Sequence, residues 1–350
     1  MKIKMVVFIL GLFLTLPLIA RDSTDIVVMK NGDRLTGEVK GLDGGVLYVS
    51  MSYILGTSSL DWSKVARLES KQLFIVKTEN GSVYKGTLNT AEGPGERPIK
   101  IEVVEGPEKQ VEIKRSEIVQ MAETSDKFWQ RFNGEVNFGA TYSKGNQTVQ
   151  YTLSSDVEYL RPRWSASTAW SSNLSTSSGV TASTRNEITP MARHLLPWNN
   201  WFYGGLGDFL QSSVQGIQLQ TSLGGGLGRY LKNTNRATIA VLGGFAWQNT
   251  QYQQSTLAGT QNLAAALVAA DVKLFKFNKT NLDFAGVVFP VLSQPGRVKF
   301  NMNAAYYIKI TGDLSWNVSF YGNWDNQPPP HFAGSDYGTS SGLSWTFGMK

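Results

Sequence analysis

The chain contains no cysteine and only two histidines among its 350 residues. Without cysteine there can be neither disulfides nor thiolate metal sites. The two histidines, His194 and His331, are far apart in the sequence, whereas a zinc site needs three or four close ligands. We therefore expect no bound metal and no cofactor.

Charged side chains are scarce in the C-terminal two thirds of the chain. Residues 21–126 hold 31 Asp, Glu, Lys and Arg, whereas residues 127–350 hold only 27. Nine of the ten tryptophans lie at or after Trp129. A charge-poor, tryptophan-rich part joined to a charge-rich part indicates two solvents, lipid and water.

The basic balance of the chain does not indicate a nucleic-acid partner. The formal net charge is +6, but no cluster of Lys and Arg is interleaved with aromatic residues, as nucleic-acid binding would need. Residues 21–126 are acidic, with 14 basic and 17 acidic side chains. We expect no nucleic acid among the partners.

The first twenty residues have the layout of a secretory signal peptide. Lys2 and Lys4 provide a positive start, residues 5–16 are mostly apolar, and Ala20 is a suitable cleavage position. The apolar run is shorter than the roughly 20 residues that span a bilayer as a helix. We expect residues 1–20 to be removed during export.

Residues 25–124 contain an internal repeat. Asn31-Gly32 and Asn80-Gly81 both lie between apolar runs, and in each case a second glycine follows five residues after the first. Asn-Gly in this setting is a strong signal for a β-hairpin. The repeat predicts two small β-modules, residues 25–72 and residues 73–124.

Residues 130–350 alternate apolar and polar side chains, which predicts β-strands with one apolar face. Near the end of the chain the apolar face holds Leu314, Trp316, Val318 and Phe320. The opposite face has small or uncharged side chains, as the lumen side of a membrane barrel does. The predicted fold is all-β: a transmembrane antiparallel β-barrel of about 12 strands, preceded by two small periplasmic β-modules.

The connections between these strands alternate in length. Short turns are predicted at residues 160–163, 232–235, 277–279 and 311–313, and longer loops at residues 175–180, 250–261 and 326–336. Membrane barrels have short periplasmic turns and longer outer loops. Both chain ends then lie on the short-turn side, which places the modules in the periplasm. Tryptophans are expected near the strand ends, where an aromatic girdle forms: Trp164, Trp198, Trp201, Trp247, Trp324 and Trp345.

Three segments resemble a bacterial family of salt-induced outer-membrane proteins, a barrel domain of unknown function. They are Lys-Asn-Gly-Asp-Arg-Leu-Thr-Gly at residues 30–37, Trp-Ser-Lys-Val at residues 62–65, and the barrel start at residues 132–146. The resemblance implies the outer membrane of a Gram-negative bacterium and no settled activity. It also implies outer-membrane lipids and the barrel-assembly machinery as partners, although the chain ends on Lys350 rather than on the aromatic residue usual in such chains.

Two groups of charged residues are the candidate site. One is expected to line the lumen, with signs that nearly balance: Glu135, Asp156, Glu158, Asp271, Lys273, Asp283, Lys299 and Lys309. The other forms a basic periplasmic rim on the short turns: Arg161, Arg163, Arg193, Lys232, Arg236, Lys276 and Lys279. The rim side chains fit contact with lipid headgroups. Our sharper hypothesis is that the acidic modules dock on this rim and cover the pore mouth.

These features predict a narrow pore or structural envelope component without catalytic activity, whose residues 25–124 contact other envelope components. One alternative is a lipase-like hydrolase, because His331 is near Asp336, Ser340 and Ser341 in the sequence. The other alternative is a secreted, soluble β-sandwich that binds a ligand, since such folds also alternate. Loss of hydrolysis in His331→Ala would support the first, and recovery without detergent the second.

Overall fold

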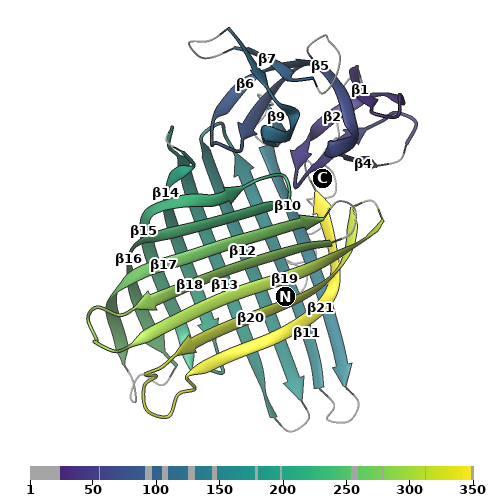
Figure 1. Cartoon of the computed structure of the whole chain (residues 1–350). Coiled ribbons are helices and arrows are strands. Elements are labelled where there is room, and N and C mark those ends of the chain that lie inside the picture. Colours follow the sequence, from purple (N-terminus) through teal and green to yellow (C-terminus); the bar gives the residue numbers. More distant parts are fainter. Residues whose placement is uncertain are drawn as a thin grey trace.

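The computed structural model describes residues 24–54, 56–90, 97–104, 109–124, 131–143, 148–177, 180–197, 199–253, 259–276, 280–311 and 313–347. The described chain is all-β and has two parts, a small N-terminal domain and a large barrel (Figure 1). No helix in these ranges is long and apolar enough to cross a membrane. The predicted signal peptide lies outside the described residues.

The N-terminal domain, called the module below, is one nine-stranded antiparallel sheet. Its strands follow the order β4-β3-β2-β1-β5-β6-β7-β8, and β9 pairs with both β2 and β5. Gly32 and Gly81 adopt φ angles of 94° and 83°, the positive values that both predicted Asn-Gly turns require. The strands are β1 (Asp25–Met29), β2 (Arg34–Asp43), β3 (Val46–Ser50), β4 (Thr57–Asp61), β5 (Val65–Thr78), β6 (Val83–Thr90), β7 (Ile99–Val103), β8 (Gln110–Ile113) and β9 (Ile118–Glu123).

The two sequence repeats are joined through the long strand β5. Its first half pairs with β1, as at Ile26↔Glu69, and its second half pairs with β6 and β9, as at Ile75↔Ala122. The boundary predicted between residues 72 and 73 lies within this strand. Pairing of β9 with β2 closes β1, β2, β9 and β5 into a small ring of strands.

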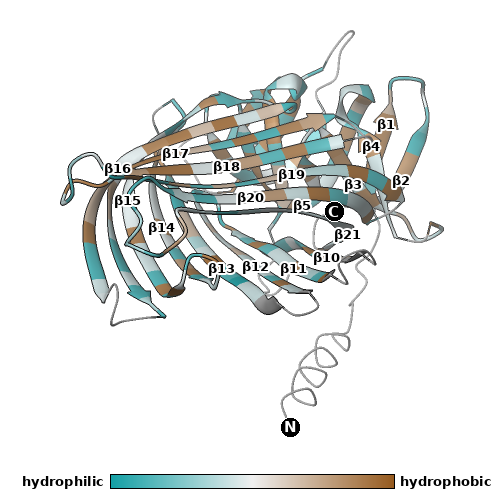
Figure 2. Ribbon diagram, turned by 90° about the horizontal axis from the view of Figure 1, so that it is seen from below, coloured by the Kyte–Doolittle hydropathy of each residue, from teal (hydrophilic) through white to brown (hydrophobic). Residues whose placement is uncertain are grey.

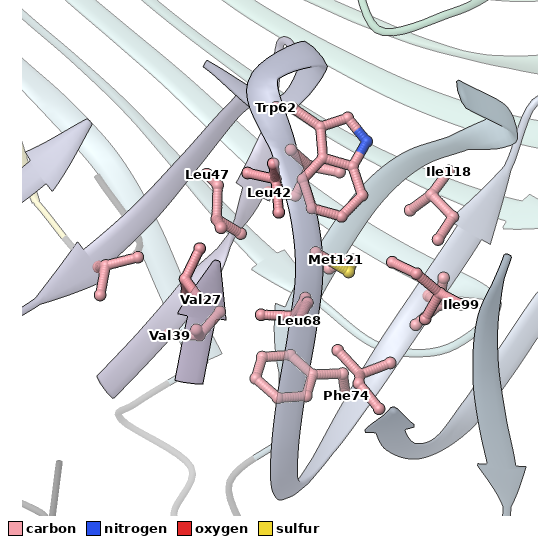
Figure 3. Packing of buried hydrophobic residues seen from close by; sticks show 14 of the residues in the cluster. Val27, Val39, Leu42, Leu47, Trp62, Leu68, Phe74, Ile99, Ile118 and Met121 are labelled. Atoms are coloured by element: carbon pink, nitrogen blue, oxygen red, sulfur yellow. The ribbon is translucent and has the colours of Figure 1, made fainter. Parts of the chain in front are cut away.

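A single hydrophobic core serves both repeats (Figure 3). Leu42 and Leu47 come from the first repeat, Ile99 and Ile118 from the second, and all four side chains are fully or almost fully buried. The core therefore holds the module together as one unit. Its centre also contains Val27, Val39, Leu68, Phe74, Ile101 and Met121.

Arg115 and Trp62 connect the two short 3₁₀ turns that close the repeats, η2 (Trp62–Lys64) and η3 (Arg115–Glu117). Trp62 Nε1 donates to the Arg115 carbonyl at 3.0 Å. Arg115 Nη1 in turn donates to the carbonyls of Trp62 and Ser63, each at 2.9 Å, and of Val65. Because the guanidinium is buried, these bonds supply the partners that a buried charge needs.

The second part is a closed antiparallel barrel of twelve strands, which confirms the predicted fold and strand number. Each strand pairs with the next, and the last closes on the first through six residue pairs from Gly134↔Phe347 to Gly139↔Gly342. The strands are β10 (Phe132–Ser143), β11 (Thr148–Leu160), β12 (Trp164–Ser177), β13 (Val180–Leu195), β14 (Trp201–Ser212), β15 (Ile217–Asn233), β16 (Ala237–Tyr252), β17 (Thr260–Lys276), β18 (Thr280–Pro290), β19 (Val298–Thr311), β20 (Leu314–Asp325) and β21 (Ser335–Phe347).

The outer surface of the barrel is apolar and the inner surface is polar. Large apolar side chains such as Phe245, Val268 and Leu343 are at least half exposed on the outside. On the inside, Gln220, Gln248 and many other polar side chains are buried. This arrangement inverts that of a soluble protein and is that of a transmembrane barrel.

Exposed tryptophans lie near both ends of the strands, as a girdle requires. Trp164 and Trp345 are near one end, and Trp247 and Trp324 are toward the other. Trp198 lies outside the described residues. The strands form two facing walls, one around β16 to β20 and one around β10 to β15 (Figure 2).

The two mouths of the barrel differ. The module-side mouth has the short connections, including residues 161–163 and 234–236, together with the start of β10 and the end of β21. The loop-side mouth has the two longest of the fully described connections, residues 291–297 and 326–334, together with the shorter connection 213–216. The module lies against the first of these mouths (Figure 1).

Candidate functional site

The module is bonded to the module-side mouth mainly by asparagine side chains of the barrel. Asn200 Nδ2 donates to the Glu79 carbonyl at 2.6 Å. Asn235 Nδ2 donates to the Ser116 carbonyl at 3.3 Å, and Asn233 does the same to Thr78 at 3.3 Å. On the opposite wall Lys309 Nζ lies 2.7 Å from Ser59 Oγ.

Close packing adds to these bonds at the same mouth. Leu160, at the end of β11, is buried against the module. The two residues of the β2–β3 turn are glycines, which lets the turn pack closely against the barrel. An ideal Cβ on Gly44 would lie 2.9 Å from the Phe275 ring, and one on Gly45 would lie 2.9 Å from the Asn235 carbonyl oxygen. The contacts therefore occur beside all five connections of this mouth and surround the opening.

We expect a disulfide to form in the double variant Gly44→Cys, Phe275→Cys. An ideal Cβ on Gly44 lies 3.4 Å from the Phe275 Cβ, near the roughly 3.5–4.5 Å that disulfides need. The natural chain has no thiol to compete. Oxidation should close a loop between module and barrel and change the migration of the denatured chain on a non-reducing gel.

The matched control pairs Gly44→Cys with Leu274→Cys, because Leu274 is the neighbouring residue on the outward face and is 41% exposed. This pair should stay open. Equal cross-linking of both pairs, or of neither, would contradict the docked arrangement.

The basic residues predicted for the rim have different surroundings. Lys232, Arg236 and Lys276 are exposed beside the module-side mouth, as is Arg161, whose guanidinium lies 5.6 Å from the centre of the Tyr159 ring. Arg163 is half-buried there. Lys279 lies outside the described residues.

Arg193 does not lie on the rim but points into the lumen. Its Nη2 atom is 2.9 Å from Asp271 Oδ2, on a strand across the barrel.

On the module side of the interface, burial raises the pKa of Glu79, and the nearby Glu117 raises it further. The hydrogen bonds that hold the module beside Glu79 are made by the neutral amides of Asn200 and Asn233, and the Glu79 carboxylate is an unfavourable charge at this place.

All eight residues predicted to line the lumen lie on the inward faces of their strands. Seven of them are in the module-side half, called the chamber below. Glu135 accepts a hydrogen bond from Tyr307 across the lumen at 2.5 Å. Asp156 and Lys273 point inward and yet remain accessible to water, so the chamber is hydrated. Its charged residues are Glu135, Asp156, Glu158, Asp271, Lys273, Asp283 and Lys309, joined by Arg193.

Like and unlike charges are neighbours on the chamber wall. Lys273 is directly opposite Asp283 on β18, which is a favourable cross-strand pair. Glu135 is directly opposite Asp156 on β11, which is an unfavourable one unless water screens it. Asp156 is exposed to solvent within the chamber, so water can provide that screening.

The middle of the lumen is narrowed by an apolar cluster. Leu206, Leu267 and Phe289 are buried there, together with Ala246 and Ala265. These side chains come from β14 and from β16 to β18. They lie between the chamber and the loop-side half of the lumen on this part of the wall.

The loop-side half is filled by buried ions that bond across the lumen. Arg185 Nη2 lies 3.0 Å from the Glu187 carboxylate and donates to Asn323 Oδ1 at 2.6 Å. The Arg185 guanidinium carbon is 4.3 Å from the centre of the Tyr321 ring. Asp336 is 3.9 Å from the same guanidinium. This set of side chains, called the loop-side network, further includes Asp208, Ser212, Gln220, Arg297, Lys299, Asn301 and Asp325.

Sequence reasoning found only Lys299 in this network. Arg185 and Glu187 follow the same two-residue period, but glycines and mixed faces obscured it around residues 183–193 and 201–210. The loop predicted at residues 326–336 includes Asp336, which is the second residue of β21. A search for charged residues two apart on a common face would have found the Arg185–Glu187 pair.

The residues of the hydrolase alternative are not arranged as a triad. His331 is exposed at the tip of a loop, whereas Asp336 Oδ2 accepts from Ser212 Oγ at 2.6 Å inside the barrel. Ser340 and Ser341 bond on opposite faces of β21. The other histidine, His194, is stacked on Trp164 with ring centres 4.3 Å apart. The described ranges contain no cluster of three or more His, Asp or Glu that could hold a metal ion.

Several solved barrels have a similar strand arrangement. The NanC porin is 10% identical over 61% of this chain and 99% of its own, with a TM-score of 0.39. The translocator domain of autotransporter NalP from Neisseria meningitidis is 12% identical over 61% and 86%, with a TM-score of 0.30. A Pseudomonas aeruginosa FadL homologue is 9% identical over 93% and 87%, with a TM-score of 0.27. Similarities this low carry no information about function.

No curated protein matches the chain. A family model does match it, over residues 136–347, which include nearly the whole barrel. In this protein the matched residues make up nearly all of strands β10 to β21, which form the barrel. The chain belongs to the family described as protein of unknown function, DUF481.

Proposed function

We propose that the protein is a narrow outer-membrane pore that is closed at rest, with the module acting as a periplasmic cap and with no catalytic role. The orientation follows from the connections, because membrane barrels place their short turns in the periplasm. The observation that supports a cap most strongly is the set of module contacts beside all five connections of one mouth.

Two barriers in series oppose passage through the lumen. One is the cap at the module-side mouth, and the other is the loop-side network with the apolar cluster beneath it. A solute must pass both, so the larger barrier limits the rate. Twelve strands give a lumen between the filled interior of eight-stranded barrels and the open channel of sixteen-stranded porins.

A single cysteine in the chamber tests the cap. Ser167, on the inward face of β12 opposite Met191, can be replaced in a chain that has no other cysteine. In detergent micelles we expect a bulky maleimide to label Ser167→Cys about tenfold or more faster once residues 25–124 are deleted, because a covered thiol reacts only during local opening.

The control is Leu292→Cys, which is 57% exposed on a loop at the opposite mouth and should react equally fast in both proteins. Equal labelling of Ser167→Cys with and without the module would refute the cap. That result would not bear on the barrel fold or on the loop-side network.

A further inference from the structure

The loop between β20 and β21, residues 326–334, folds over the loop-side mouth. Phe332 packs against Leu210, Ile217 and Tyr252, and its ring centre is 4.9 Å from that of Tyr252. Gly216 leaves room for this ring, since an ideal Cβ there would lie 2.2 Å from a Phe332 ring carbon. The Phe332 amide donates to the Pro329 carbonyl at 3.1 Å, which keeps the loop in a compact turn.

A small cavity lies beneath this loop. About 20 Å³ of it is open to the centres of water molecules, which is enough for one or two waters. Its upper wall is apolar and includes Tyr252, Pro328 and Phe332, whereas polar side chains of the loop-side network form its floor. An apolar wall with a few converging polar groups is the usual make-up of a small-molecule site.

Lys299 on the floor lacks the partners that a buried ammonium normally has. Its side chain is 6% exposed, and Nζ donates to Gln220 Oε1 at 3.2 Å. The nearest carboxylate oxygen in an ion pair with it, Asp325 Oδ2, is 4.0 Å away. Both oxygens of the Asp325 carboxylate already accept hydrogen bonds from Arg297, from Nη2 at 2.6 Å and from Nε at 3.0 Å. An ammonium carries three donors, so this one has capacity for an anion.

A second polar group in the cavity has no partner. Gln215 is 6% exposed and lines the cavity, and within the described chain its Oε1 atom makes no hydrogen bond. A half-turn of its amide would place two N–H donors in the same position. Lys299 and Gln215 therefore both line the cavity with polar groups that can donate to a carboxylate.

We propose that this cavity is a binding site for a small organic carboxylate with an apolar body, with residues 326–334 as its lid. The carboxylate would bind Lys299 and Gln215, and the apolar body would contact Tyr252 and Phe332. The inference deepens the proposed function, on which it rests, by assigning a class of solute to the same lumen. The lid must lift for such a molecule to enter, because a cavity of about 20 Å³ has room only for water.

Benzoate and benzyl alcohol are suitable probes because they share a ring and differ in charge. Binding is measured by equilibrium dialysis of the full chain in detergent micelles, with protein-free micelles as the blank. We expect benzoate to bind, and Lys299→Gln to weaken it by at least about tenfold, since hydrogen bonds to charged groups contribute that much. Lys299→Arg keeps the positive charge and a hydrogen bond to the carboxylate, so its benzoate affinity should stay within about threefold of that of the natural chain.

Retained heat-modifiable migration on gels shows that each variant is folded. Benzoate binding that is equal in Lys299→Gln and the natural chain would overturn the site, and so would benzyl alcohol binding as tightly as benzoate. Dialysis does not depend on conduction. A chain that binds benzoate but never conducts would thus contradict the pore and support the site, whereas a conducting chain that ignores benzoate would do the reverse.

Discussion

Replacing Arg185 with alanine should lower the free energy of unfolding of the barrel by about 3–5 kcal/mol, because it leaves buried carboxylates without their cation. The guanidinium and Glu187 are among the least exposed charges of the chain, with side chains 4% and 6% exposed. Asp336 would lose the same partner. Urea titration of the protein in lipid vesicles, followed by the loss of heat-modifiable migration, measures the change.

The companion variant removes both members of the closest pair. In the natural chain Arg185 Nη2 lies 3.0 Å from the Glu187 carboxylate. The double variant Arg185→Ala, Glu187→Ala removes both groups, so the Glu187 carboxylate is not left buried without its cation. The double variant should therefore be more stable than the single one, which is the non-additivity expected of coupled residues. A single variant as stable as the natural chain would mean that the network does not carry buried charge at all.

Arginine in place of Phe245 should lower the free energy of unfolding by about 2–4 kcal/mol if the outer surface faces lipid. Phe245 is in the middle of β16, 71% exposed and outward. In a soluble sandwich the same change would replace an exposed apolar ring with a charge and would be harmless or favourable. The effect therefore separates the membrane barrel from its soluble alternative.

The control for this change is Tyr53→Arg in the module. Tyr53 is 67% exposed, but it lies in the part of the chain that we place in water. We expect its replacement to leave stability within about 0.5 kcal/mol. Similar tolerance of arginine at both positions would argue against a lipid-facing wall.

Much of the barrel could be predicted from the sequence because its rule is local. Side chains such as Leu314 and Ser315 alternate with a period of two, and each strand of the barrel pairs with its neighbour in sequence. The inward placement of residues such as Asp156 and Lys273 follows from the same alternation. The strand number and the inward-facing charged positions can therefore be predicted from the sequence, whereas the long loop predicted at residues 175–180 is wrong because β12 extends to Ser177 and β13 begins at Val180.

The remaining features depend on contacts between distant residues, which no local pattern reports. The repeats predicted two modules, but pairing of β9 with β2 joins them around one core. The hypothesis of a module on the rim emphasised charge, whereas hydrogen bonds from Asn200 and Asn235 hold the module at this mouth. Neutral asparagines on turns look like ordinary turn residues in the sequence.

The conductance of four proteins in planar bilayers tests the two-barrier account most directly. They are the full mature chain, the chain without residues 25–124, the Arg185→Ala, Glu187→Ala variant, and the combination of both changes. Because the barriers act in series, we predict low conductance for the first three and, for the combination, an increase greater than the sum of the two separate increases. A full chain that conducts as freely as the combined variant would contradict the account.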